Sequence, residues 1–111
     1  MDLGAVGEDG VGRGHEARPA IDGRAYYMLE LDDYVSVVAL TADRQMVLVR
    51  QYRHPARRHL LEIPAGTREA GEDPDLTAAR EVREETGFAA GRLERIGGAW
   101  MAPGFSGEFI T

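Results

Sequence analysis

Hydrophobic residues are sparse at the start of the chain and become dense from Ala25 onward. Residues 1–20 contain few apolar side chains, and glycines recur between Gly4 and Gly14, a composition typical of a flexible segment. We therefore expect residues 1–20 to form a flexible glycine-rich tail and residues 21–111 to form one domain.

Short apolar runs after this tail predict β-strands. Residues 34–41 and 45–52 are expected to pair as a hairpin, because the Ala42-Asp43-Arg44 segment between them has turn composition. The run from Met46 to Val49 does not alternate between apolar and polar residues, which predicts burial on both faces. The full set of expected strands covers residues 26–31, 34–41, 45–52, 60–63, 95–101 and 105–111.

One helix is predicted between Asp73 and Gly87. Asp73 can accept hydrogen bonds from first-turn N–H groups, and Pro74 suits the first helical position. Gly87 suits the left-handed residue that follows a helix. The combination of strands on both sides of one helix predicts a mixed sheet packed by a helix, in the α/β (α+β) class.

Three glutamates of this helix carry the candidate chemistry. Glu81, Glu84 and Glu85 are spaced at i, i+3 and i+4, so they share one face. Like charges at this spacing cost roughly a few tenths of a kcal/mol per pair, so a bound cation is expected. Oxygen ligands suit Mg²⁺ or Mn²⁺. The residues expected to pack against the sheet lie opposite: Leu76, Ala79 and Val82, with Thr86 beside them.

Composition excludes several other function classes. The net charge of −6 argues against nucleic acid as a partner, because phosphate backbones attract Lys and Arg. The chain has no cysteine and no lysine, so thiol nucleophiles, disulfides, P-loop lysines and Schiff bases are excluded. No apolar run approaches a membrane span and no signal peptide is evident, so we expect a cytoplasmic protein without a membrane partner.

The segment from Gly66 to Phe88 resembles the Nudix box. Gly66 is followed after five residues by Glu72, and after seven more by the run Arg80-Glu81-Val82-Arg83-Glu84-Glu85-Thr86-Gly87-Phe88. Every fixed position of that signature is filled, although an exposed acidic helix is the alternative interpretation. The resemblance implies a Nudix α/β/α sandwich around a mixed β-sheet. Family members continue beyond residues 105–108, so we expect the C-terminal strand and helix to be missing here.

Short motifs outside the box are similar to those of the ADP-ribose pyrophosphatase branch, and the resemblance covers residues 25–111. These motifs are VRQYR at residues 49–53, LEIPAG at 61–66 and APGFSGE at 102–108. The resemblance implies metal-dependent hydrolysis of a small nucleoside diphosphate sugar, with ADP-ribose giving AMP and ribose 5-phosphate. It also implies a homodimer. Two alternatives stay open: a domain that binds nucleotide or a partner chain without turnover, and a hydrolase for another nucleoside diphosphate derivative.

The resemblance also implies roles for individual helix residues. Glu81 and Glu85 match the principal metal ligands of the box, and Glu84 matches a further ligand or a residue that holds water. The backbone carbonyl of Ala65 matches another metal contact. Arg80 matches the arginine that orients a helix glutamate, so Glu84, Glu85 and Arg80 are the expected catalytic residues.

Residues outside the helix have implied roles as well. Glu72 matches a glutamate that supports the loop, Arg53 matches a residue that contacts substrate phosphate, and Glu108 matches an acid near the substrate sugar. A guanidinium can form paired hydrogen bonds with a phosphate, which favours Arg53 in this role. Tyr52 and Trp100 are candidates for stacking on a nucleobase, with a place in the core as the alternative.

Overall fold

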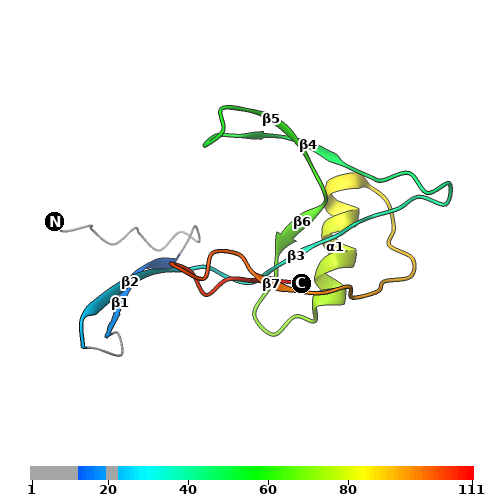
Figure 1. Ribbon diagram of the computed structural model, residues 1–111. Coiled ribbons are helices and arrows are strands. Elements are labelled where there is room, and N and C mark those ends of the chain that lie inside the picture. The colour runs from blue at the N-terminus through cyan, green and yellow to red at the C-terminus, as the bar shows by residue number, and fades with distance from the viewer. Residues whose placement is uncertain (1–12, 20–22) are drawn as a thin grey trace.

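The computed structural model describes residues 13–19 and 23–111, which form a mixed arrangement of strands and one helix, as predicted (Figure 1). The helix, α1, covers Pro74–Thr86. The strands in chain order are β1 (Arg13–Pro19), β2 (Ala25–Glu30), β3 (Tyr34–Ser36), β4 (Val49–Arg53), β5 (Arg58–Glu62), β6 (Ala65–Thr67), β7 (Ala99–Trp100) and β8 (Phe109–Ile110).

A four-stranded mixed sheet in the order β6-β3-β8-β7 forms the centre of the fold. Strand β3 runs antiparallel to β6 and parallel to β8, and β7 runs antiparallel to β8. Helix α1 packs against β3 and β6. The antiparallel pairs β1-β2 and β4-β5 form two further sheets that extend away from this centre (Figure 1).

The helix begins and ends where the sequence predicts. Asp73 is extended, and its carboxylate accepts a hydrogen bond from the N–H of Asp75 at 2.8 Å. Pro74 occupies the first turn, where its missing N–H costs nothing. Gly87 adopts the left-handed conformation with φ of 78°, and its N–H donates to the carbonyl of Arg83. These local signals therefore determine both helix ends.

The strand between residues 34 and 41 is shorter than predicted. Only Tyr34–Ser36 joins the sheet, although a bridge between Leu40 and Met46 confirms the predicted hairpin turn. Strand β4 pairs with β5 instead of with this segment. The prediction that the run from Met46 to Val49 is buried on both faces is wrong, because it leads out of the four-stranded sheet. Met46 is 53% exposed there.

The predicted flexible tail contains a strand. Arg13–Pro19 forms β1, which pairs with β2 along its whole length, so the expectation of an unstructured segment is wrong for these residues. This pairing provides hydrogen-bond partners for backbone N–H and C=O groups of β1. The remainder of the predicted tail, residues 1–12 and 20, lies outside the described residues.

The packed face of α1 includes Val82, as predicted, but otherwise differs from the predicted one. Its buried residues are Thr77, Ala78, Glu81 and Val82, whereas Leu76 is 64% exposed. The helix therefore lies rotated, with Glu81 toward β6. The sheet permits this because β6 contributes small residues at the contact.

No helix in the described part of the chain has the length and apolar character that crossing a membrane requires.

Candidate active site

Glu81 lies at the contact between helix α1 and strand β6. Its carboxylate occupies the space that a β-carbon at Gly66 would fill. The side chain is almost fully buried, and Arg80 Nη1 donates to its Oε1 at 2.5 Å. A buried carboxylate needs a cationic or hydrogen-bonding partner, and Arg80 provides both. Gly66 and Arg80 together fix Glu81 at the edge of the sheet.

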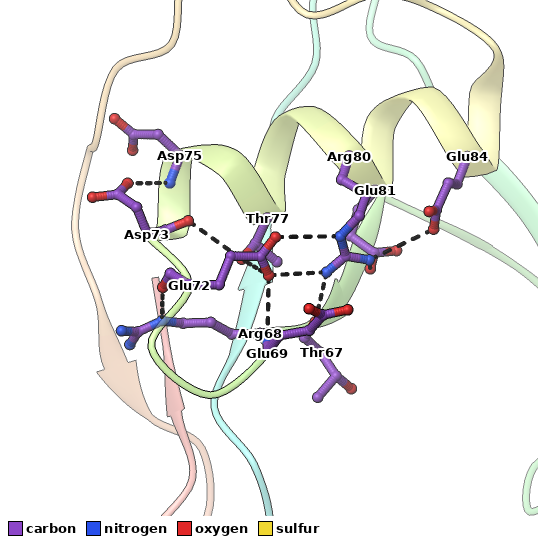
Figure 2. A network of polar contacts seen from close by, with 10 residues as sticks. All are labelled: Thr67, Arg68, Glu69, Glu72, Asp73, Asp75, Thr77, Arg80, Glu81 and Glu84. Carbon is purple, nitrogen blue, oxygen red and sulfur yellow. Dashed lines mark hydrogen bonds and ion pairs between the residues drawn. The ribbon is translucent and has the colours of Figure 1, made fainter.

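Arg80 also connects the helix to the loop before it (Figure 2). Its Nη2 donates to Glu72 Oε2 and to the carbonyl of Thr67, each at 3.1 Å. Glu72 Oε2 in turn accepts from the hydroxyl of Thr77 at 2.8 Å and from the N–H of Glu69 at 3.2 Å. The hydrogen bonds from Arg80, followed by that from Thr77, lower the pKa of Glu72 to about 2. The hydrogen bonds to Glu72 raise the pKa of Arg80, so both groups are charged at neutral pH.

Glu85 contacts the same strand one turn further along the helix. Its Oε2 accepts from the N–H of Ala65 at 3.2 Å. Glu81, Glu85 and Ala65 all border one cavity of about 560 Å³, which also contains Gly66 and Arg80. The structure therefore brings Glu81 and Glu85, the predicted principal metal ligands, together with Ala65, whose backbone carbonyl was predicted as another metal contact.

Glu84 takes a different position. Its side chain is 60% exposed and its carboxylate lies 3.6 Å from Arg80 Nη1. The residue borders neither this cavity nor the one described next. Arg80 Nη1 thus contacts both Glu81 and Glu84, and Figure 2 shows the guanidinium between the carboxylates of Glu72 and Glu84. The role predicted for Glu84 stays a prediction.

A second cavity of about 620 Å³ brings together residues from distant parts of the chain. Four residues singled out in the sequence border it: Arg53, Ala65, Glu85 and Glu108. Arg53 comes from β4, and its Nε and Nη2 donate to the two carboxylate oxygens of Glu62 on β5, at 2.8 and 3.0 Å. Ala65, Gly66, Thr67 and Glu85 border both cavities, so the two cavities adjoin.

Glu108 also borders this second cavity. Its backbone N–H donates to the buried hydroxyl of Ser106 at 3.0 Å. Tyr34 borders the same cavity, and burial together with the nearby carboxylate of Glu108 raises the pKa of its phenol. Glu108 and Tyr34 thus border only the second of these two cavities, Glu81 borders only the first, and Glu85 borders both.

The two candidate stacking residues lie outside this cavity. Tyr52 is 46% exposed and makes edge-on contacts with His54 and His59, at 5.0 and 5.3 Å between ring centroids. It is on the face of β4 opposite Arg53, because successive strand residues alternate in direction. Trp100 is exposed and contacts the ring of Phe109. Neither aromatic residue is in the core.

The donor set at the helix suits a hard divalent cation. Carboxylate and carbonyl oxygens are the preferred protein ligands of Mg²⁺ and Mn²⁺, and Glu81, Glu85 and Ala65 supply them at one cavity. Within residues 13–19 and 23–111, no three acidic or histidine side chains converge as a metal cluster. Glu81, Glu85 and Ala65 thus border the same cavity, whereas Glu84 does not.

Sequence reasoning gave no role to two titratable residues that border the larger cavity, Glu62 and Tyr34. The register of the β4-β5 hairpin places Val49 opposite Glu62 and Arg58 opposite Arg53, so strand pairing alone would not have revealed that the side chains of Arg53 and Glu62 meet. Tyr34 carries no signal either, because a tyrosine at the start of an apolar run is typical of any strand.

Comparison with known proteins agrees with this geometry. A family model described as the NUDIX domain matches residues 31–110. The chain is 43% identical over 76 residues to an ADP-ribose pyrophosphatase of Bacillus subtilis, covering 68% of this chain and 41% of that protein. It is 46% identical over 77 residues to an ADP-ribose pyrophosphatase of Mycobacterium tuberculosis, covering 68% of this chain and 37% of that protein.

Another relative and one solved structure extend the comparison. The chain is 45% identical over 76 residues to a methanol dehydrogenase activator of Bacillus methanolicus, covering 68% of this chain and 41% of that protein. It thus spans less than half the length of these curated relatives. A crystal structure of an ADP compounds hydrolase superposes with a TM-score of 0.74 at 23% identity, covering 99% of this chain and 62% of that one. At this identity the likeness shows a shared fold.

Proposed function

The chain belongs to the Nudix family, and from this premise we propose that it hydrolyses the pyrophosphate bond of a nucleoside diphosphate sugar. ADP-ribose is the first substrate to test, because two of the similar proteins are named ADP-ribose pyrophosphatases. Water would add across the phosphoanhydride, so that one bridging P–O bond breaks and AMP and ribose 5-phosphate form.

The cavity that contains Arg53, Ala65, Glu85 and Glu108 is the observation that carries this proposal. A nucleoside diphosphate sugar presents a charged diphosphate and a hydroxyl-rich sugar. The first requires cations and N–H donors, and the second requires hydrogen-bond acceptors. Arg53 serves the diphosphate, and the carboxylate of Glu108 accepts hydrogen bonds from sugar hydroxyls.

Glu81, Glu85 and the carbonyl of Ala65 would hold a divalent ion, Mg²⁺ or Mn²⁺. When bound, such an ion neutralises diphosphate charge and lowers the pKa of a coordinated water, which makes it a nucleophile at neutral pH. Glu84 holds water at the exposed edge of the helix. Arg80 keeps Glu81 in place through their 2.5 Å contact, and Arg53 binds the phosphoryl oxygens through hydrogen bonds.

A direct test is AMP release from ADP-ribose in the presence of Mg²⁺, alongside a panel of other nucleoside diphosphate sugars and oxidised nucleotides. Preferential release from ADP-ribose supports the proposal. Turnover restricted to another member of the panel would move the substrate to that compound. Calorimetric binding of ADP-ribose without any product would instead support a nucleotide-binding domain that lacks turnover.

We also propose that the chain acts as a homodimer. The β1-β2 pair extends away from the four-stranded sheet, which leaves it accessible to a second copy (Figure 1). Light scattering coupled to size-exclusion chromatography measures the mass in solution. A mass of one chain across the working concentration range would contradict this assignment.

A further inference from the structure

Glu62 is an acidic residue in a cavity that is expected to bind an anion. It comes from β5, lies opposite Val49 of β4, and borders the larger cavity beside Arg53. An isolated carboxylate at this place would repel a diphosphate, since like charges in a partly shielded cleft interact unfavourably. Its presence therefore requires an explanation in terms of its neighbour.

That neighbour is Arg53, four residues further along β4 than Val49. The side chains of Val49, Gln51 and Arg53 alternate to one face of the strand, and Glu62 reaches the same face from β5. Glu62 Oε2 and Oε1 accept from Arg53 Nε and Nη2 at 2.8 and 3.0 Å. Such paired hydrogen bonds fix the plane of the guanidinium as well as its position.

This contact leaves part of Arg53 available for a ligand. Glu62 uses Nε and one N–H of Nη2, so the two N–H groups of Nη1 and the other of Nη2 remain. The side chains of Arg53 and Glu62 are 51% and 31% exposed, so the pair is accessible from the cavity. The same cavity contains Glu85, whose negative charge also acts on the guanidinium.

We propose that Glu62 is a positioning residue for substrate binding, which orients Arg53 so that its remaining N–H groups face the diphosphate. This inference rests on the proposed function. Without Glu62, the flexible arginine side chain samples several rotamers and loses orientation, so binding weakens. Without Arg53, Glu62 only repels the ligand, so its removal then brings no further loss.

The test is a double-mutant cycle of Arg53→Ala, Glu62→Gln and the combined variant, with KM and kcat for ADP-ribose and Mg²⁺ as readouts. Glu62→Gln keeps the side-chain length but converts one acceptor oxygen to an N–H₂ group that faces an arginine donor. We expect KM to rise about tenfold, with kcat changed by less than about twofold, because an oriented contact to bound substrate is lost. Arg53→Lys keeps the charge but not the paired hydrogen bonds, so it should raise KM similarly.

The combined variant distinguishes positioning from a direct role. We expect its KM to equal or fall below that of Arg53→Ala alone. A combined KM above that of Arg53→Ala would show that Glu62 acts without Arg53, and an unchanged KM in Glu62→Gln would equally overturn the proposal. The matched control is Glu94→Gln, which removes an exposed ion pair to Arg92 that lies outside the site. Thermal unfolding of each variant separates lost binding from lost fold.

A binding experiment tests the positioning role even if the parent chain releases no AMP. In that case the parent, Arg53→Ala, Glu62→Gln and the combined variant are compared by calorimetric titration with ADP-ribose. A weaker Kd in Glu62→Gln that disappears in the Arg53→Ala background supports the positioning role in a chain without turnover. No binding of ADP-ribose by the parent would overturn both proposals together.

Discussion

The carboxylate of Glu81 lies in the space directly over Gly66, so helix α1 and strand β6 meet where a β-carbon has no room. Glu81 is expected to bind metal, and its position depends on this close approach. Glycine is required here for its small size, since its φ is not in the left-handed region. This contact connects the first residue of the Nudix box to its helix.

Gly66→Ala should therefore displace Glu81 from the site. We expect AMP release to fall by about 100-fold or more, because a misplaced acidic ligand loses electrostatic stabilisation of the reaction. Unfolding temperature should change little, because the displaced group is the far end of a flexible side chain. Steady-state kinetics and thermal unfolding of the purified variant measure the two effects.

Gly91→Ala is the control for this substitution. A β-carbon at Gly91 meets no atom within 4 Å, and the backbone there has no positive φ. Its activity should match the parent's. Full activity in Gly66→Ala would mean that Glu81 need not occupy its observed position.

Val82 and Leu76 give opposite predictions for stability. Val82 is 4% exposed and Leu76 is 64% exposed. Val82→Ala should lower the free energy of unfolding by about 2 kcal/mol, since it removes buried apolar surface and leaves a cavity. Leu76→Ala should change it by less than about 0.5 kcal/mol. Urea denaturation measures both, and a larger effect of Leu76→Ala would show that Leu76 belongs to the packed face of the helix.

The Glu72–Arg80 ion pair predicts a specific dependence of stability on pH. The pKa of Glu72 falls from 4.5 to about 2 in the folded protein. Because the folded value is the lower one, the ion pair stabilises the fold fully above about pH 4.5 and loses this effect as the pH falls toward 2. Glu72→Gln should thus unfold a few degrees below the parent at neutral pH.

The difference between the two proteins should shrink on acidification. Thermal unfolding from about pH 6 to about pH 3 follows this loss directly. A difference in unfolding temperature that stays constant over this range would exclude the Glu72 charge as its source. Thr77→Val is a useful companion variant, because it removes the hydrogen bond from the Thr77 hydroxyl to Glu72 and keeps the Glu72 carboxylate.

The helix and the shared face of its glutamates were predictable because their signals are local. Asp73, Pro74 and Gly87 act within one turn of the helix ends, and the spacing of Glu81 and Glu85 follows from helix geometry alone. Burial of Glu81 was not predictable in this way. A hydropathy pattern assigns a glutamate to the solvent face, whereas the tertiary contact with Gly66 places it inside.

The Arg53–Glu62 pair shows a second limit of sequence patterns. Its two residues are nine positions apart, and the hairpin register places Val49 opposite Glu62. The contact with Arg53 therefore depends on how far the two side chains reach along the hairpin, which a sequence pattern does not give. Likewise, Leu76 is apolar but faces solvent, because the orientation of a helix is set by what it packs against.

Glu85→Gln is the variant that addresses the central claim. Glu85 Oε2 accepts from the N–H of Ala65 at 3.2 Å, and a glutamine oxygen can accept the same hydrogen bond. The fold should therefore survive while the negative charge at the proposed metal site is lost. Glu94→Gln again removes an exposed carboxylate elsewhere and serves as its control.

The most direct measurement is the rate of AMP release from ADP-ribose with Mg²⁺, compared between the parent chain and Glu85→Gln at matched folding. The account predicts release by the parent and by Glu94→Gln, and a loss of about 100-fold or more in Glu85→Gln. Equal rates in the parent and in folded Glu85→Gln would contradict the proposal that this helix carries the catalytic site.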